Sequence, residues 1–171
     1  MNPVTTRLRI GFGHDIHALV PDRELWLGGV RIPHEFGLQG HSDADVLLHA
    51  VMDALLGAAA LGDIGMLFPD TDPSFCGISS RILLERVMSR LHEAGYRVVN
   101  LDTMIHCERP KIGPHREAIR ESLAAGLNIG KQCVSVKAGT NEGFDAVGEK
   151  KAMVCKAVVL IESLGGDDHG R

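Results

Sequence analysis

The sequence predicts a single-domain α/β (α+β) protein with a small mixed β-sheet and helices packed on one face of it. The chain has 171 residues, a length typical of one domain that buries enough surface to fold without disulfides. Apolar residues make up 44% and charged residues 23%, which is ordinary for a globular protein. Segments with strand periodicity and segments with helix periodicity alternate along the chain, so the helices can cover a sheet.

Each predicted element has its own local signal. The glycine pair 28–29 marks the turn of a hairpin, and Pro33 ends it. Ser42 and Asp43 indicate the start of the first helix, and Gly95 ends the second. The pattern of apolar residues predicts strands at 7–12, 25–27, 30–32, 97–107, 133–138 and 152–162, and helices at 43–60, at 79–94 and after Pro114.

Three segments have no regular pattern. Residues 37–42 indicate a glycine-punctuated loop. Residues 61–78 form a loop too long to be only a connection in a compact domain, so we expect it to be functional. The polar residues 165–171 are predicted to form a disordered tail after a domain at 1–164.

Composition and charge exclude several classes of function. The formal charge is −4 and no basic stripe occurs, which argues against nucleic-acid binding. No run of about 18 apolar residues occurs, so we expect no membrane span, and the first residues lack the apolar core of a secretory signal. The four cysteines are isolated, which argues against a Cys-x-x-Cys motif and favours a reducing cytosol.

The stretch GHDIH at 13–17 follows a strand-like run and carries metal-ligand residue types. Asp15 and His17 are spaced i, i+2, and His49 lies in an apolar stretch of the first predicted helix. Two imidazoles and one carboxylate suit a zinc ion with an open fourth position. A solvated strand end and a core histidine bonded to a carbonyl are the structural alternative, and spacing alone leaves both interpretations open.

Two stretches in the middle of the chain also have two interpretations. The stretch HSDADV is either a helix cap or an anion site at a helix N-terminus, where His41 and Ser42 add donors. Asp63 beside a glycine, and the loop FPDTDP at 68–73, are either turns or acceptors for substrate hydroxyls.

The stretch VKAGTNEGFD at 136–145 is either an ordinary glycine loop or a phosphate site. In the second case Thr140 donates to phosphate and Glu142 holds a hard cation such as magnesium. No P-loop, complete dinucleotide fingerprint or G-x-S-x-G elbow occurs. Phosphates handled by this chain would therefore be neutralised by metals and helix ends.

Five stretches resemble the 2-C-methyl-D-erythritol 2,4-cyclodiphosphate synthase family of the non-mevalonate isoprenoid pathway. They cover nearly the whole chain in order, and the block at 41–73 is the most specific. The stretches are GHDIH (13–17), HSDADVLLHA (41–50), DALLGAAALGDIGMLFPDTDP (53–73), PKIGPH (110–115) and VKAGTNE (136–142).

The resemblance implies a role for each matching residue. It implies zinc at Asp15, His17 and His49, where the first two also meet the substrate, and magnesium or manganese at Glu142 and the substrate diphosphate. It implies that His41 and Thr140 stabilise the transition state. The other implied substrate contacts are Ser42, Phe68, Asp70 and Asp72 for the phosphorylated methylerythritol part, Asp63 and Gly65 for the ribose, Cys107, Pro110, Lys111, Ile112 and Gly113 for the cytosine, and Ala138 and Gly139 near the diphosphate.

The implied enzyme is a phosphorus–oxygen lyase that cyclises 4-diphosphocytidyl-2-C-methyl-D-erythritol 2-phosphate and releases CMP. The reaction is an intramolecular phosphoryl transfer, in which proximity and charge neutralisation are the main tasks. The resemblance also implies a homotrimer with sites between subunits, in the cytoplasm or, after removal of a transit peptide, in the plastid stroma. The alternatives are a non-catalytic nucleotide-binding trimer and a zinc phosphohydrolase.

A few positions depart from the family pattern. Glu149 replaces an arginine near the trimer axis, so an anion bound there would lose its cationic partner, although Lys150 or Lys151 can substitute for it. Gly139 replaces a threonine beside the diphosphate and removes a hydroxyl donor. None of these departures affects the three implied zinc ligands.

Overall fold

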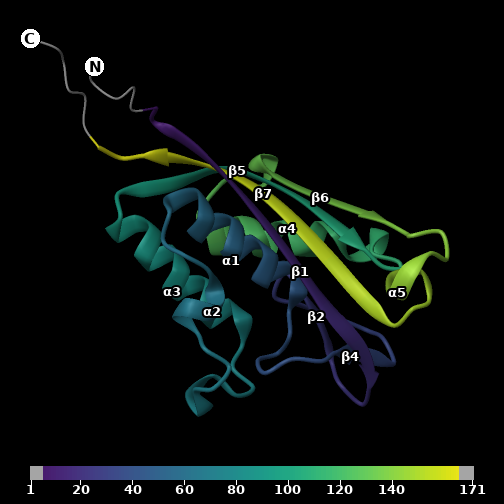
Figure 1. Ribbon diagram of the computed structural model, residues 1–171. Helices are drawn as coiled ribbons and strands as arrows, with labels where there is room; N and C mark the ends of the chain where they lie inside the picture. The colour runs from purple at the N-terminus through teal and green to yellow at the C-terminus, as the bar shows by residue number, and fades with distance from the viewer. Residues whose placement is uncertain (1–5, 166–171) are drawn as a thin grey trace, which may run out of the picture.

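The computed structural model describes residues 6–165, so the predicted tail lies outside the described residues except for Gly165. A five-stranded sheet has the order β4-β1-β7-β5-β6, and β2 and β3 form a separate hairpin (Figure 1). The strands are β1 (Leu8–Pro21), β2 (Leu25–Leu27), β3 (Val30–Ile32), β4 (Phe36–Leu38), β5 (Tyr96–His106), β6 (Val134–Gly139) and β7 (Ala152–Ser163). The helices are α1 (Val46–Ala59), α2 (Ile64–Leu67), α3 (Ser80–Glu93), α4 (Arg116–Leu127) and α5 (Asp145–Gly148), with short 3-10 turns at Pro73–Phe75, Gly113–His115 and Lys131–Cys133.

The sheet is mixed, as the sequence predicts. The long strands β1 and β7 run antiparallel from the pair Leu8–Glu162 to the pair Ala18–Ala152. On the other side of β7, strand β5 is also antiparallel, whereas β5 and β6 are parallel. A parallel neighbour needs a crossover connection, and α4 lies in that connection.

Helices cover one face of the sheet, as predicted, and α1 lies along β1 and β7 (Figure 1). Successive strand residues point to opposite faces. In β7 the helix-facing residues are buried, and Cys155, Val159 and Ile161 have no exposed surface. On the other face, Ile10 and Phe12 of β1 are 71% and 61% exposed. The core therefore lies on one side of the sheet, and the opposite face is open in a single chain.

Two glycines of β1 let the backbone of α1 approach the strand directly. A Cβ atom built on Gly11 would lie 1.8 Å from the Ala54 carbonyl oxygen, and one on Gly13 would lie 1.9 Å from that of Ala50. No side chain fits at these distances from the helix backbone, so both strand positions require glycine. This contact fixes α1 against the segment of β1 that carries Asp15.

Asp45 holds the hairpin against the start of α1. It is the N-cap, and its carboxylate accepts the N–H groups of Leu48, Gly28 and Gly29 at 3.0, 2.9 and 2.6 Å. The carboxyl has no exposed surface, and burial raises its pKa although the three donors oppose the shift. The polar N-cap therefore positions both the helix and the hairpin turn.

Three of the predicted element boundaries are wrong. The first strand continues past residue 12 to Pro21, so GHDIH lies within a strand and not after its end. The expected loop at 37–42 begins inside β4, which pairs with the extra length of β1. The first helix begins at Val46 and not near Ser42, because the buried Asp45 supplies the cap.

Candidate metal centre and adjoining cavities

Three predicted metal ligands converge between β1 and α1. Asp15 and His17 are two residues apart on β1 and therefore share the helix-facing side of the sheet. Asp15 Oδ2 lies 2.9 Å from His17 Nε2 and 3.1 Å from His49 Nδ1, and the two imidazole nitrogens are 3.2 Å apart. One potential ligand atom from each residue lies within 4.8 Å of the other two. The structural interpretation, a solvated strand end with a separate core histidine, is therefore wrong.

The chemistry of these atoms fits a cation. His17 Nδ1 lies 2.5 Å from the Gln39 carbonyl oxygen, which can only accept, so this nitrogen carries a proton. In a neutral His17 ring the lone pair is then on Nε2, which faces the Asp15 carboxylate. Two acceptors at this distance need a positive charge between them. Two imidazoles and a carboxylate with an open position are a ligand set typical of catalytic zinc.

The pKa shifts point in the same direction. Burial alone would raise the pKa of Asp15, but hydrogen bonds from the protonated rings of His17 and His49 hold it well below its usual range. Burial would lower the pKa of His17, but the hydrogen bond and charge of Asp15 raise it. A positive charge is thus favoured at the point between these groups, whether a proton or a metal ion supplies it.

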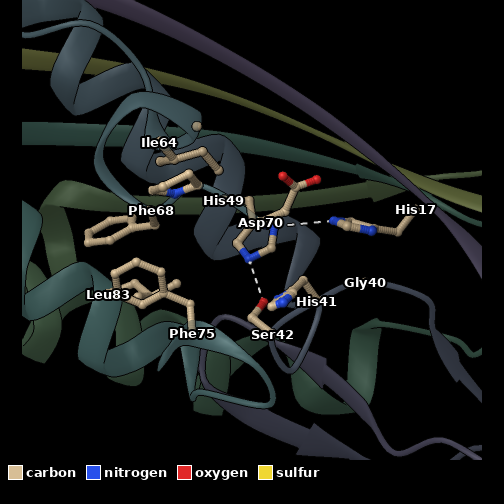
Figure 2. Close-up of a pocket in the computed structure, with 12 residues that line it drawn as sticks. His17, Gly40, His41, Ser42, His49, Ile64, Phe68, Asp70, Phe75 and Leu83 are labelled. Atoms are coloured by element: carbon tan, nitrogen blue, oxygen red, sulfur yellow. Dashed lines mark hydrogen bonds between the residues drawn. The ribbon is translucent and has the colours of Figure 1, made fainter. Parts of the chain in front are cut away.

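A cavity of about 480 Å³, here called the histidine cavity, opens beside His17 and His49. In Figure 2 the imidazoles of His17 and His49 lie on one side of this cavity, and Phe68, Phe75 and Leu83 lie on the other. His41 Nδ1 is buried in its wall and has no hydrogen-bond partner within residues 6–165. Of the predicted site residues, this cavity is lined by His17, His41, Ser42, His49, Gly65, Phe68 and Asp70.

A second cavity of about 150 Å³, the strand-end cavity, lies where β5 and β6 end. The Cys107 N–H donates to the Gly139 carbonyl at 3.0 Å and joins the segment after β5 to the end of β6. Burial, and secondarily the charge of Glu108, raises the pKa of the Cys107 thiol to about 11. Of the predicted site residues, this cavity is lined by Cys107, Pro110, Lys111, Ile112, Gly113, Ala138, Gly139 and Thr140.

Besides the candidate metal ligand Asp15, three predicted contacts lie outside both linings. Asp63 caps α2 by accepting the Met66 N–H at 2.9 Å, and Asp72 accepts the Ser74 N–H at 2.9 Å. Glu142 is exposed in the turn after β6, and the Thr140 hydroxyl donates to its Oε1 at 2.5 Å. These carboxylates order their loops in the unliganded chain.

Two of the N–H groups at the predicted anion site before and in α1 are used by side chains of the same stretch. The Leu48 N–H is taken by the Asp45 carboxylate, and the Ala44 N–H donates to Ser42 Oγ at 3.1 Å. Ser42 is 6% exposed, and its Oγ also lies 3.2 Å from His49 Nε2. The cap explains this stretch, and the polar group left for a ligand is the His41 imidazole.

Sequence reasoning missed several residues around these cavities. Phe75 and Leu83 line the histidine cavity, and Glu108 and Arg116 line the strand-end cavity, but single apolar and charged residues carry no specific local signal. Ser80 Oγ lies 3.0 Å from His49 Nε2 although the two residues are 31 positions apart, a contact that no spacing rule predicts.

Within residues 6–165, no helix has the length and apolar character needed to cross a lipid bilayer.

The fold and the converging side chains define an α+β protein with a candidate Asp-His-His metal site. The chain belongs to the YgbB family, whose sequence profile matches residues 8–162. It is 54% identical over 158 residues to the 2-C-methyl-D-erythritol 2,4-cyclodiphosphate synthase of Bordetella avium, covering 92% of this chain and 98% of that protein.

Solved structures give the same likeness. A 2C-methyl-D-erythritol-2,4-cyclodiphosphate synthase in its CDP-bound form is 39% identical with a TM-score of 0.84, and the match covers 90% of this chain and all of that one. The CDP complex of IspF from Plasmodium falciparum is 33% identical with a TM-score of 0.82, covering 94% and 100%. These likenesses agree with the family resemblance seen in the sequence.

Proposed function

We propose that this protein is a 2-C-methyl-D-erythritol 2,4-cyclodiphosphate synthase. It converts 4-diphosphocytidyl-2-C-methyl-D-erythritol 2-phosphate to the cyclic diphosphate and releases CMP. The observation that carries the proposal is the convergence of Asp15, His17 and His49 on one point beside a substrate-sized cavity. Relatives of the same name at more than 50% identity support the substrate and the reaction.

The reaction forms one phosphorus–oxygen bond and breaks another. An oxygen of the 2-phosphate attacks the β-phosphorus, and the bond from that phosphorus to the oxygen of CMP breaks, with CMP taking the electron pair. The attacking phosphate is already an anion near neutral pH, so no strong general base is needed. The chain must bring two anionic groups together, and binding both in one site achieves this.

The residues divide this task between them. Zinc bound by Asp15, His17 and His49, and magnesium or manganese bound by Glu142 and the substrate diphosphate, would act as Lewis acids that neutralise phosphate charge. His41 lines the histidine cavity, and rotation of its ring would bring the buried, unpartnered Nδ1 to a phosphate oxygen there. The Thr140 hydroxyl, which donates to Glu142 in the unliganded chain, can turn to a phosphate oxygen.

The remaining predicted contacts orient the two ends of the substrate. Phe68 and Asp70, in the wall of the histidine cavity, would hold the methylerythritol part. The strand-end cavity would hold the cytosine through the backbone of residues 107–113, and Asp63 and Gly65 would hold the ribose. A complex with CDP would test the cytosine and ribose contacts, and a complex with the whole substrate would test those of Phe68 and Asp70. Relatives that bind CDP support a nucleotide site.

The active enzyme is a homotrimer in this proposal, and its sites lie between subunits. The histidine cavity lies near β1 and the strand-end cavity near β6, and two strands, β7 and β5, separate β1 from β6 in the sheet. His41 and Thr140 thus belong to separate cavities of one chain. A cyclic assembly can bring the strand-end cavity of one subunit to the histidine cavity of the next.

The open face of the sheet supports this assembly. Ile10, Phe12 and Ile16 of β1 are more than half exposed, which is unusual for neighbouring large apolar residues. Replacing Phe12 by Asp should convert the trimer to monomers in light scattering and abolish activity, with the circular dichroism spectrum retained. A trimer of unchanged mass and activity would contradict this interface.

Four free cysteines support a reducing compartment such as the cytoplasm.

The experiment that tests the function is a product analysis. Purified protein with zinc and magnesium is given the diphosphocytidyl sugar phosphate, and the products are followed by phosphorus NMR. The expected products are CMP and a cyclic diphosphate. A linear hydrolysed product would identify a zinc phosphohydrolase, and nucleotide binding without release of CMP by a verified trimer would identify a non-catalytic protein.

A further inference from the structure

The two ring nitrogens of His49 have different surroundings. Nδ1 faces the other candidate metal ligands, at 3.1 Å from Asp15 Oδ2 and 3.2 Å from His17 Nε2. Nε2 points the other way, into a buried polar group, at 3.0 Å from Ser80 Oγ and 3.2 Å from Ser42 Oγ (Figure 2 shows the second contact). The partners of Nε2 therefore decide which nitrogen carries the proton.

Ser80 can only accept a hydrogen bond from His49. Its Oγ lies 2.5 Å from Asp43 Oδ1, and because a carboxylate has no proton to give, the Ser80 hydroxyl donates to Asp43. The oxygen of Ser80 then presents a lone pair to His49 Nε2. Ser42 Oγ accepts the Ala44 N–H and lies 3.2 Å from His49 Nε2. Its hydroxyl proton can be donated to Ser80 Oγ at 3.5 Å, which leaves its second lone pair facing Nε2. The proton of a neutral His49 ring is thus on Nε2, and its lone pair is on Nδ1.

Asp43 and Ser80 make further hydrogen bonds that fix their positions. Asp43 Oδ2 accepts the Ser80 N–H at 2.9 Å, and the Asp43 N–H donates to the Ile78 carbonyl at 3.0 Å. Ser80 is the first residue of α3 and has no exposed surface. Asp43 and Ser80 are 37 positions apart, so this contact joins the segment before α1 to the start of α3.

We propose that Ser80 and Asp43 are positioning residues for the metal ligand His49. They keep the proton of its ring on Nε2, turn the lone pair of Nδ1 toward Asp15 and His17, and make Nδ1 the ligand atom. The proposal rests on metal binding by these three residues and not on the identity of the substrate. A second hydrogen-bonded partner of this kind typically changes metal affinity about 10- to 100-fold.

The first test measures metal affinity without any reaction. Zinc affinity of the trimer is determined by competition with a chromophoric chelator for the unaltered protein and for Ser80→Ala. We expect the variant to bind zinc about 10- to 100-fold more weakly. Ser79→Ala is the matched control, because it removes a neighbouring hydroxyl that caps α3 but does not face His49. Equal zinc affinity in Ser80→Ala, or an equal loss in Ser79→Ala, would overturn the proposal.

A double-mutant cycle distinguishes the relay, meaning the hydrogen bonds from His49 to Ser80 and from Ser80 to Asp43, from a general effect on packing. Asp43→Asn should weaken zinc binding in the unaltered background and have little further effect in Ser80→Ala, because both residues act through the same hydrogen bond to His49. Additive losses would contradict a connected relay. Thermal unfolding of each metal-free variant reports whether the fold is retained.

A second measurement needs no variant. In zinc-loaded protein with nitrogen-15-labelled histidine, we expect the proton of the His49 ring on Nε2 and the metal on Nδ1. The reverse assignment would overturn the proposal even if every variant fails to fold. Because zinc binding and the NMR assignment do not depend on turnover, a protein that binds zinc but makes no cyclic product would disprove the proposed function and leave the relay standing.

Discussion

The histidine cavity and the strand-end cavity are built from different parts of the chain. Around the first, side chains from a strand, a helix and two loops direct their polar atoms to one point, and Asp15, His17 and His49 supply the chemistry. Around the second, the lining follows one segment, 107–113, and the end of β6, and a backbone hydrogen bond closes it. The first cavity therefore depends on side-chain identity, and the second on backbone shape.

The largest expected effect comes from removing one ligand of the histidine cavity. His49→Ala should lose zinc and at least about 10³-fold of the turnover, because the charge of the phosphates is no longer neutralised. The sheet and α1 are already packed without an ion, so circular dichroism and trimer mass should be nearly unchanged. His92→Ala, on the exposed end of α3, is the control. Loss of the trimer on removal of zinc by a chelator would instead make the metal structural.

The next largest effect is expected from a substitution that moves the backbone of α1 away from β1. Gly13→Ala places a methyl group 1.9 Å from the Ala50 carbonyl oxygen, so α1 must move away from β1. We expect the free energy of unfolding to fall by about 3 kcal/mol and zinc affinity to fall with it.

A second glycine provides the matched control for that variant. A Cβ on Gly57, which lies in α1, would meet no atom within 4 Å. Gly57→Ala should therefore raise the free energy of unfolding by about 1 kcal/mol. Chemical denaturation measures both changes. Two variants with the same sign would show that the contact of β1 with α1 is not close.

A smaller effect is expected in the strand-end cavity. Lys111 is an exposed residue of its lining, and its ammonium group can meet the nucleotide phosphates. Lys111→Ala should raise KM about 3- to 10-fold and leave kcat unchanged, because the backbone that shapes the cavity stays in place. Steady-state kinetics separates the two constants. A fall in kcat with constant KM would show that this cavity also takes part in the chemistry.

The smallest effect concerns the thiol in that cavity. The pKa of Cys107 is raised to about 11, chiefly by burial, so at pH 8 only about one thiol in a thousand is a thiolate. Its reaction with an aromatic disulfide should be about 100-fold slower than that of the exposed Cys76 and should accelerate as the pH approaches 11. Mass spectrometry of labelled peptides measures both rates. Equal rates at pH 8 would show that the cavity is open to reagents.

The sequence determined the class of the fold and the ligand set. Helical spacing predicts α3 to within one residue at each end, and apolar runs predict β5 and β7, because these signals are local. The residue types Asp15, His17 and His49 indicate zinc, since two imidazoles and a carboxylate suit that ion. The family resemblance adds the substrate, which no local pattern contains.

Contacts between segments distant in the sequence bring these side chains together. The spacing of GHDIH does not reveal that β1 continues to Pro21, because the extra length forms by pairing with β4 and β7, which are distant in sequence. The relay from Asp43 through Ser80 to His49 could not be predicted from the sequence either, because it joins residues more than 30 positions apart. Local propensities act over a few residues, whereas packing and hydrogen bonding between distant segments determine which atoms share a site.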